Sequence, residues 1–177
     1  MVSRADIKFC FMALEEANKS KLHSKHGVII TKGKKIVASG YNNNRSLVNG
    51  KMVICLHAEI DAILRWRSRC FKEFSNSNRK DKKIIDKISR KENNFTMYVV
   101  RENKNIHDKE KPFSYSKPCA DCCQKLLECN FKKIVYTTGD KSIAECMRKH
   151  QITNSNFTHA TKTLKKNTNN YNRLIYI

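Results

Sequence analysis

The stretch Gly27-Val-Ile-Ile-Thr-Lys-Gly-Lys-Lys-Ile-Val-Ala-Ser-Gly40 decides the fold class, because it predicts a β-hairpin. Each half is rich in β-branched, apolar residues, which is typical of strands. The two halves are joined around residues 32–34, where Gly33 supplies the turn. We therefore expect two adjacent strands here, with the other elements arranged on either side of them along the chain.

Helices and strands alternate around this hairpin. Residues 3–19 carry apolar side chains at helical spacing, with Ser3 as a candidate N-cap, and residues 58–69 show a second helical pattern. Residues 95–101 and 132–138 are rich in β-branched and aromatic residues and predict strands, with a helix at 119–129 between them. This order of elements predicts an α/β layer architecture around one mixed sheet.

Two short motifs lie where predicted helices begin: His57-Ala-Glu59 and Pro118-Cys119-Ala-Asp-Cys122. One imidazole and two thiolates supply three zinc ligands and leave the fourth tetrahedral position open, which is typical of catalytic rather than structural zinc. The partial positive charge of a helix N-terminus favours the thiolate form of both cysteines. We therefore expect His57, Cys119 and Cys122 to hold a catalytic Zn2+.

Glu59 supplies a carboxylate beside this metal without being one of its ligands. The combination of H-x-E with P-C-x-x-C is the signature of zinc deaminases, in which the metal activates a water and the glutamate transfers its protons. Such a carboxyl group serves as base and then as acid when its pKa lies near the working pH. We expect Glu59 to be the catalytic residue.

With both motifs, the Gly27–Gly40 hairpin and the following Tyr41-Asn42 in place, residues 3 to 140 resemble the cytidine and deoxycytidylate deaminase superfamily. The resemblance implies a three-layer α-β-α fold with a mixed central sheet of about five strands. It also implies that the Asn42 amide, the Ala58 backbone N–H and the Lys117 backbone carbonyl bind the substrate. Members of this superfamily often assemble into homo-oligomers.

The chain departs from two branches of that superfamily. The segment between Glu59 and Pro118 is longer than in compact nucleic-acid-editing deaminases, which weakens a direct analogy to them. The chain also lacks the Pro-Cys-x8-Cys spacing of the riboflavin-pathway deaminases. The function expected first is therefore hydrolytic deamination of a cytosine nucleoside or nucleotide to the uracil form, with a deoxycytidylate-type substrate preferred and Arg45 a candidate for its phosphate.

A net charge of +20 leaves a second function open. Lys and Arg neutralise nucleic-acid phosphates, so the alternative is an editor of cytosine in single-stranded DNA or RNA, or of tRNA adenosine. Trp66, Phe71 and Phe74 interleave with basic residues, as a stacking platform for bases would require. The abundance of Lys and Asn also fits a coding sequence rich in A and T, which gives positive charge without a binding role. A zinc-stabilised binding module is a third hypothesis, which Glu59 disfavours.

The predicted organisation is one deaminase domain over residues 1–150, followed by a basic extension over 151–177 whose Leu174–Ile177 end is a last strand or a docked tail. Residues 70–94 predict a polar helical insertion and residues 102–113 a polar connection. No run is apolar enough for a membrane helix, and eight cysteines without a signal peptide favour metal binding in a reducing, intracellular compartment, whether cytoplasm or nucleus.

Overall fold

The computed structural model describes residues 2–45, 47–48, 51–52, 55–75, 95–104, 112–129, 131–139 and 143–147. Within these residues the chain forms helices and strands in the predicted order. The helices are α1 (Arg4–Ala17), α2 (Ala58–Ser75) and α4 (Ala120–Glu128). The strands are β1 (His26–Lys32), β2 (Lys35–Tyr41), β3 (Leu47–Val48), β4 (Lys51–Met52), β5 (Phe95–Glu102), β6 (Phe113–Ser114), β7 (Lys133–Thr137) and β8 (Ala144–Met147).

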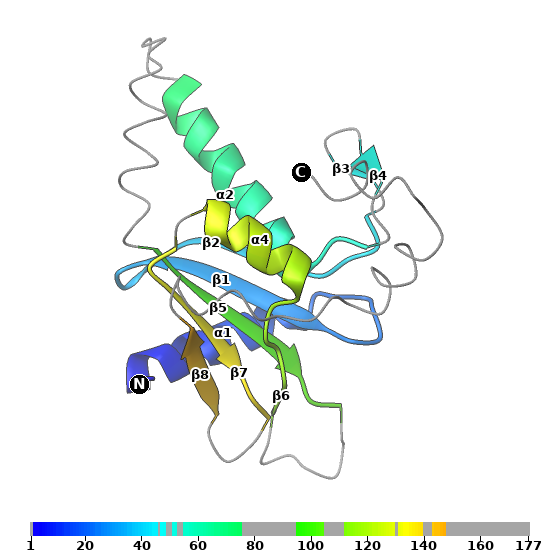
Figure 1. The fold of residues 1–177 in the computed structure, drawn as a ribbon, viewed down its shortest axis with the longest axis vertical. Helices are drawn as coiled ribbons and strands as arrows, with labels where there is room; N and C mark the ends of the chain where they lie inside the picture. The colour runs from blue at the N-terminus through cyan, green and yellow to red at the C-terminus, as the bar shows by residue number, and fades with distance from the viewer. Residues whose placement is uncertain are drawn as a thin grey trace.

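One mixed sheet organises the fold, with strand order β2-β1-β5-β7-β8 and β6 paired to β5 (Figure 1). The β5–β7 pair is parallel, whereas the other neighbours in this sheet are antiparallel. A parallel pair needs a crossover connection, and α4 lies within the one between β5 and β7. The predicted mixed sheet of about five strands is confirmed.

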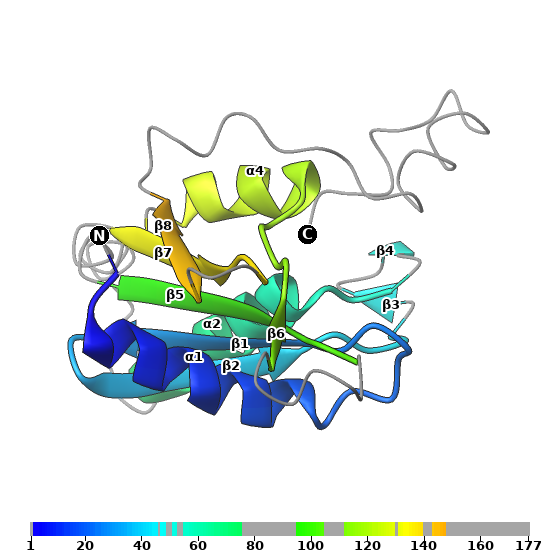
Figure 2. The same cartoon turned by 90° about the horizontal axis from the view of Figure 1, so that it is seen from below.

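Helices cover both faces of the sheet, as Figure 2 shows, with α1 on one side and α2 and α4 on the other. Successive strand residues point to opposite faces, so β1 places Val28 and Ile30 in the core under α2 and α4, and Ile29 in the core under α1. Residues of β5 and β7 alternate in the same way. The predicted three-layer α-β-α architecture is therefore confirmed, and its two buried faces explain why the strands are nearly continuous apolar runs.

Two local structures form where the sequence predicted them, namely the N-cap of α1 at Ser3 and the hairpin turn at Gly33. The Ser3 side chain accepts a hydrogen bond from the Asp6 N–H, and the Asp6 carboxylate accepts one from the Ser3 N–H, which completes a capping box at the start of α1. Gly33 has a φ of 60° in the hairpin turn, a conformation that favours glycine. Both signals set the boundaries of elements that the sheet then holds in place.

Two glycines let the helices approach the hairpin closely. A Cβ at Gly27 would overlap the Ala13 carbonyl of α1, and a Cβ at Gly40 would lie 2.5 Å from the Ala62 nitrogen of α2. Because glycine has no Cβ, the backbones can pack at these short distances. Gly40 therefore determines how deeply the first turns of α2 sit against β2.

The structure differs from the sequence prediction in four places. Helix α2 continues to Ser75 rather than ending near residue 69, so the first residues assigned to the 70–94 insertion extend this helix. Strands β6 and β8 and the small β3–β4 pair were not predicted. Each is only two to four residues long, which is too short for a period of two to be recognised.

Several predictions fall outside the described residues. They are the rest of the insertion over 76–94, most of the 102–113 connection, the boundary at residue 150 and the 151–177 extension with its Leu174–Ile177 end. Among the described helices, none combines the length and apolar character that a membrane crossing requires.

Candidate metal centre and pocket

The two sequence motifs meet because α2 and α4 begin at the same end of the sheet. His57 immediately precedes α2, Cys119 is the N-cap of α4, and Cys122 lies in the first turn of α4. The Cys119 side chain makes no capping hydrogen bond to its own helix, and its backbone is extended, with φ of −72° and ψ of 169°. Both sulfurs are thus presented from one helix start toward the imidazole of the other.

The donor atoms lie at distances that suit one metal ion. The His57 Nδ1 atom lies 3.3 Å from the Cys122 Sγ and 3.6 Å from the Cys119 Sγ, and all three donor atoms lie within 4.8 Å of one another. Tetrahedral zinc with ordinary bond lengths would separate a sulfur from a nitrogen by about 3.6 Å and two sulfurs by about 3.8 Å. The predicted residues His57, Cys119 and Cys122 therefore fit zinc as they stand.

The protonation of this group also suits a cation. The hydrogen bond from Cys122, aided by His57, lowers the pKa of Cys119 to about 4 despite burial of the sulfur. Burial works to lower the pKa of His57, but the neighbouring Cys119 and Cys55 sulfurs outweigh it and raise that pKa to about 11. The hydrogen bond to Cys119 and burial raise the pKa of Cys122, so without metal the group holds one thiolate, one thiol and an imidazolium, and a divalent cation displaces the protons when it binds.

Glu59 lies in the first turn of α2, two residues after the predicted metal ligand His57. Glu59 is only 6% exposed, and this burial raises the pKa of its carboxyl group. It is not part of the three-donor group described above. A carboxyl group with a raised pKa therefore stands close to the metal-binding atoms.

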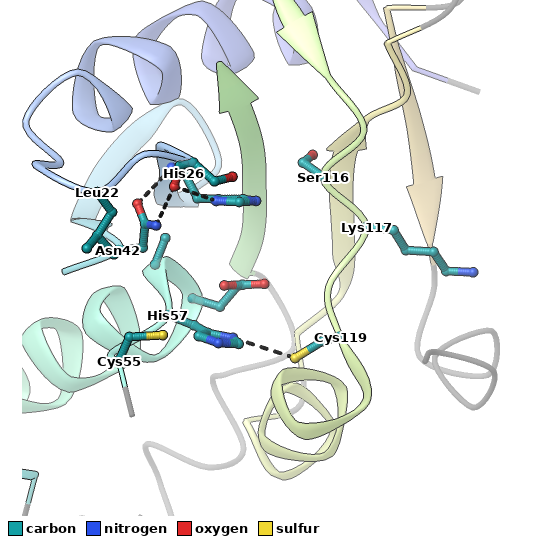
Figure 3. Close-up of a pocket in the computed structure, with 11 residues that line it drawn as sticks. Leu22, His26, Asn42, Cys55, His57, Ser116, Lys117 and Cys119 are labelled. Carbon is teal, nitrogen blue, oxygen red and sulfur yellow. Dashed lines mark hydrogen bonds between the residues drawn. The ribbon is translucent and has the colours of Figure 1, made fainter. Parts of the chain in front are cut away.

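A pocket of about 310 Å3 opens over these groups. It is lined by Leu22, Ser24, His26, Asn42, Cys55, His57, Ala58, Glu59, Ser116, Lys117 and Cys119. Figure 3 shows Asn42 and His26 on one side of the pocket, with His57 and Cys119 on the other. The structure therefore brings Asn42, His57, Ala58, Glu59, Lys117 and Cys119 together in one pocket, with Cys122 joining through the metal group rather than the pocket wall, whereas the phosphate candidate Arg45 does not line it.

Five lining residues were not predicted, namely Leu22, Ser24, His26, Cys55 and Ser116. Cys55 and Ser116 each lie two residues before a motif, and their closeness in sequence was the available signal. Leu22 and Ser24 lie between α1 and β1 and carry no pattern that indicates a site. Only the packing of this loop against the end of β2 places them at the pocket.

Asn42 fastens that loop to the sheet. Its Oδ1 atom accepts a hydrogen bond from the His26 N–H at 2.8 Å, and its Nδ2 donates to the Ser24 carbonyl at 2.6 Å. Its backbone carbonyl accepts a further bond from the Ser20 hydroxyl at 2.7 Å. Asn42 therefore shapes the pocket wall, whatever it also binds.

Trp66 is the one aromatic residue of the proposed stacking platform whose side chain the structure describes. Trp66 is 3% exposed and packs in the core, with its ring 5.0 Å from that of Phe95 and 5.9 Å from that of Phe131. The prediction that Trp66 stacks on nucleic-acid bases is wrong, because the ring lies on the face of α2 that packs on the sheet. The side chains of Phe71 and Phe74 lie outside the described residues.

Comparison with solved structures gives distant likenesses. A deoxycytidylate deaminase from the cyanophage S-TIM5, solved with dCMP and dUMP, is 18% identical, with coverage of 78% of this chain and 84% of that chain and a TM-score of 0.43. A cytidine deaminase from Burkholderia pseudomallei is 18% identical, with coverage of 89% and 100% and a TM-score of 0.49. RibD from Acinetobacter baumannii is 16% identical, with coverage of 76% and 28% and a TM-score of 0.43. No curated protein matches the chain.

A family model matches most of the chain. The family described as the cytidine and deoxycytidylate deaminase zinc-binding region matches residues 3–138, which contain both motifs and the whole pocket. The predicted zinc cofactor is confirmed at this level, because the family is defined by zinc binding and the three donor atoms fit the ion. The chain therefore belongs to the cytidine and deoxycytidylate deaminase family.

Proposed function

We propose that this protein is a zinc-dependent hydrolytic deaminase that converts a cytosine nucleoside or nucleotide to the uracil form and releases ammonia. One observation carries the proposal: a buried carboxyl group and a three-donor metal group share one pocket. A site that only stabilised the fold would need no buried glutamate beside its metal, and burying such a group without purpose costs free energy.

His57, Cys119 and Cys122 are proposed to hold the zinc ion, which when bound acidifies a water molecule and so supplies a nucleophile at neutral pH. Glu59 takes a proton from that water as oxygen adds to C4 of the base, and it delivers the proton to the neighbouring ring nitrogen. The proton of the added hydroxyl group then passes through Glu59 to the amino group, the C4–N bond breaks as the C4 carbonyl forms, and ammonia leaves. Water and cytosine thus yield uracil and ammonia, with Glu59 returned to its starting state.

Two backbone groups are proposed to orient the base. Ala58 is the first residue of α2, and the first N–H groups of a helix have no partner within the helix, so its N–H can bind the polar edge of the ring. The Lys117 carbonyl, two residues before the Cys119 ligand, is proposed to accept a hydrogen bond from the amino group under attack. Both residues line the pocket.

Substrate size and charge are the finer part of the proposal. A pocket of about 310 Å3 falls in the range of small-molecule sites, which supports a single nucleoside or nucleotide as substrate. A deoxycytidylate preference requires a cation for the phosphate. Lys117 is the one Lys or Arg among the described lining residues, and Arg45 is exposed and does not line the pocket.

The test is a substrate panel. The zinc-loaded protein is incubated with cytidine, deoxycytidine, their 5′-monophosphates, single-stranded DNA and single-stranded RNA, and uracil products are measured. We expect turnover of at least one monomer. Product only from polynucleotide, with activity falling steeply as salt rises, would instead identify an editing enzyme.

Two further predictions concern location and assembly. An intracellular location is still a prediction. Assembly into a homo-oligomer is also a prediction, and the mass of the purified protein in solution tests it directly.

A further inference from the structure

His26 is a pocket residue that neither the metal group nor the proton transfer uses. It is the first residue of β1, and its side chain lines the same pocket as Glu59. Figure 3 shows the His26 and His57 rings on different sides of that pocket, with the Asn42 side chain bonded to the His26 backbone. An imidazole in this position presents a polar atom to whatever fills the space between them.

The hydrogen bonding of the His26 ring determines which of its two nitrogens carries the proton and which can accept a hydrogen bond. The Nδ1 atom of His26 lies 3.4 Å from the Ser24 carbonyl oxygen, and a carbonyl can only accept a hydrogen bond. This contact therefore assigns the proton to Nδ1. In the neutral ring Nε2 then carries a lone pair and acts as an acceptor.

The surroundings keep this ring neutral and in place. Burial and the charge of Arg101, its cross-strand partner on β5, lower the pKa of His26 to about 4. The Asn42 side chain holds the backbone that leads into His26, since it bonds the His26 N–H and the Ser24 carbonyl. The acceptor is thus positioned before any ligand binds.

Cytosine nucleosides offer few donors to such an acceptor. The base has one donor group, its amino group, which the proposed function assigns to the Lys117 carbonyl beside the metal. A fully ionised phosphate has no proton to donate. The remaining donors are the sugar hydroxyl groups.

We propose that His26 is a specificity-determining residue whose Nε2 atom accepts a hydrogen bond from a sugar hydroxyl of the substrate. The proposal rests on the proposed function and adds the group of the substrate that the pocket recognises away from the reacting carbon. One hydroxyl of the sugar then contributes to binding, and analogues that lack it bind less well.

The first measurement uses the unmodified, zinc-loaded protein. The value of kcat/KM is determined for cytidine and for its 2′-deoxy, 3′-deoxy and 5′-deoxy analogues, and for the 2′-deoxy and 3′-deoxy forms of the 5′-monophosphate. We expect about a tenfold lower kcat/KM for one analogue, because one hydrogen bond is lost. Equal kcat/KM values across the series would overturn the proposal.

The second measurement compares His26→Leu with His26→Gln. Leu cannot accept a hydrogen bond, so we expect about a tenfold higher KM on substrates that keep the recognised hydroxyl, little change in kcat, and no further loss on the analogue that lacks it. Gln supplies an acceptor oxygen and should restore most of the loss. His23→Leu is the matched control, because His23 is exposed in the same loop and does not line the pocket.

Two results contradict the inference in different ways. An equal loss by His26→Leu on every analogue, without rescue by Gln, assigns His26 a packing role and leaves the deaminase activity standing. Absence of turnover of any cytosine monomer by the unmodified protein removes the proposed function, and the inference with it.

Discussion

Glu59 is buried and lies two residues after His57, one of the three donors that could hold the metal. Burial disfavours the charged form and raises its pKa, whereas a bound cation favours the charged form and lowers it. The two effects oppose each other. A residue that acts as base and then as acid must both accept and release a proton, and the proposed role of Glu59 depends on these two opposed effects.

The substitution Glu59→Gln tests this role at the residue scale. Gln keeps the size and polarity of the side chain but cannot transfer a proton, so we expect kcat to fall by about a hundredfold or more while zinc content and melting temperature stay close to normal. Ammonia release and metal analysis measure the two effects. The exposed Glu15→Gln on α1 removes the same charge and should change neither. Undiminished turnover in Glu59→Gln would remove the acid/base assignment.

At the scale of elements, the position of α2 on β2 determines where His57 and Glu59 lie. Gly40 lets the two backbones meet, and the Tyr41 N–H donates a hydrogen bond to the Asp61 carboxylate at 3.2 Å. Asp61 in turn pairs with Arg65 at 2.9 Å. The first turns of α2 are therefore fixed to the end of the hairpin by packing and by polar contacts together.

Gly40→Ala should disturb the site although residue 40 does not line the pocket. The added Cβ would lie 2.5 Å from the Ala62 nitrogen, so α2 must shift away from β2. We expect a loss of about 2 kcal/mol in the free energy of unfolding from overpacking, and a zinc affinity lower by about tenfold because the His57 end of α2 moves.

Urea unfolding and a competition assay with a metal-binding dye measure the two losses. Gly33→Asn is the control, since nothing lies within 4 Å of its Cβ position and Asn tolerates the φ of 60°. A normal zinc affinity in Gly40→Ala would show that the helix position does not control the metal group.

Helix α1 is joined to the opposite face of the sheet by a partly buried ion pair between Asp6 and Lys133. The Asp6 carboxylate accepts hydrogen bonds from Lys133 of β7 and Tyr98 of β5, each at 2.8 Å. Burial works to raise the pKa of Asp6, but the bond from Lys133 and those from Ser3 and Tyr98 outweigh it and lower the pKa from 3.8 to about 2. The charged form of Asp6 is therefore part of how α1 is held.

This pKa gives the stability of the protein a defined dependence on pH. Because the folded-state pKa lies below the ordinary value, the contribution of about 2 kcal/mol is present above pH 4 and is lost as the pH falls toward 2. We expect Asp6→Asn to be less stable than the unmodified protein at pH 6, with the difference shrinking across this window. Urea unfolding at several pH values measures it.

The matched comparison is Glu16→Gln on the same helix. Glu16 pairs with Lys19, whose side chain is largely exposed, and pairs of this kind contribute little. We expect a difference near zero at every pH for this variant. An Asp6→Asn difference that is constant from pH 6 to pH 2 would contradict the assigned pKa.

At the scale of the whole molecule, the sequence predicted the metal group and the layered fold more completely than it predicted the pocket. His57, Cys119 and Cys122 lie within local motifs, and the long apolar strands have strong periodicity. Both predictions could therefore be made from residues that are close together in the sequence. The other pocket wall depends on Ser24 and His26, whose place is determined by Asn42 across the end of the sheet. No local pattern records a contact of that kind.

The interpretation of Trp66 failed for a related reason. Aromatic residues beside arginines on a helix suit either a nucleic-acid surface or a buried face, and only the sheet beneath α2 decides between them. The rings of Phe95 and Phe131 pack against the Trp66 ring. The short strand β8 was missed because its pairing to β7 supplies the order that its own four residues do not.

Zinc should also stabilise the molecule as a whole. The three donors join the starts of α2 and α4, so an ion that binds them favours the folded chain over the unfolded one. At free zinc a thousandfold above its dissociation constant, binding adds about 4 kcal/mol, which corresponds to roughly 10 °C in melting temperature for a chain of this size. We expect a chelator to remove this increment and added zinc to restore it.

Cys119→Ser should have the melting temperature of the chelated protein both with and without zinc, whereas Cys146→Ser on β8 should keep the full response to zinc. A melting temperature indifferent to zinc in the unmodified protein would mean that these residues do not hold the ion in the folded state.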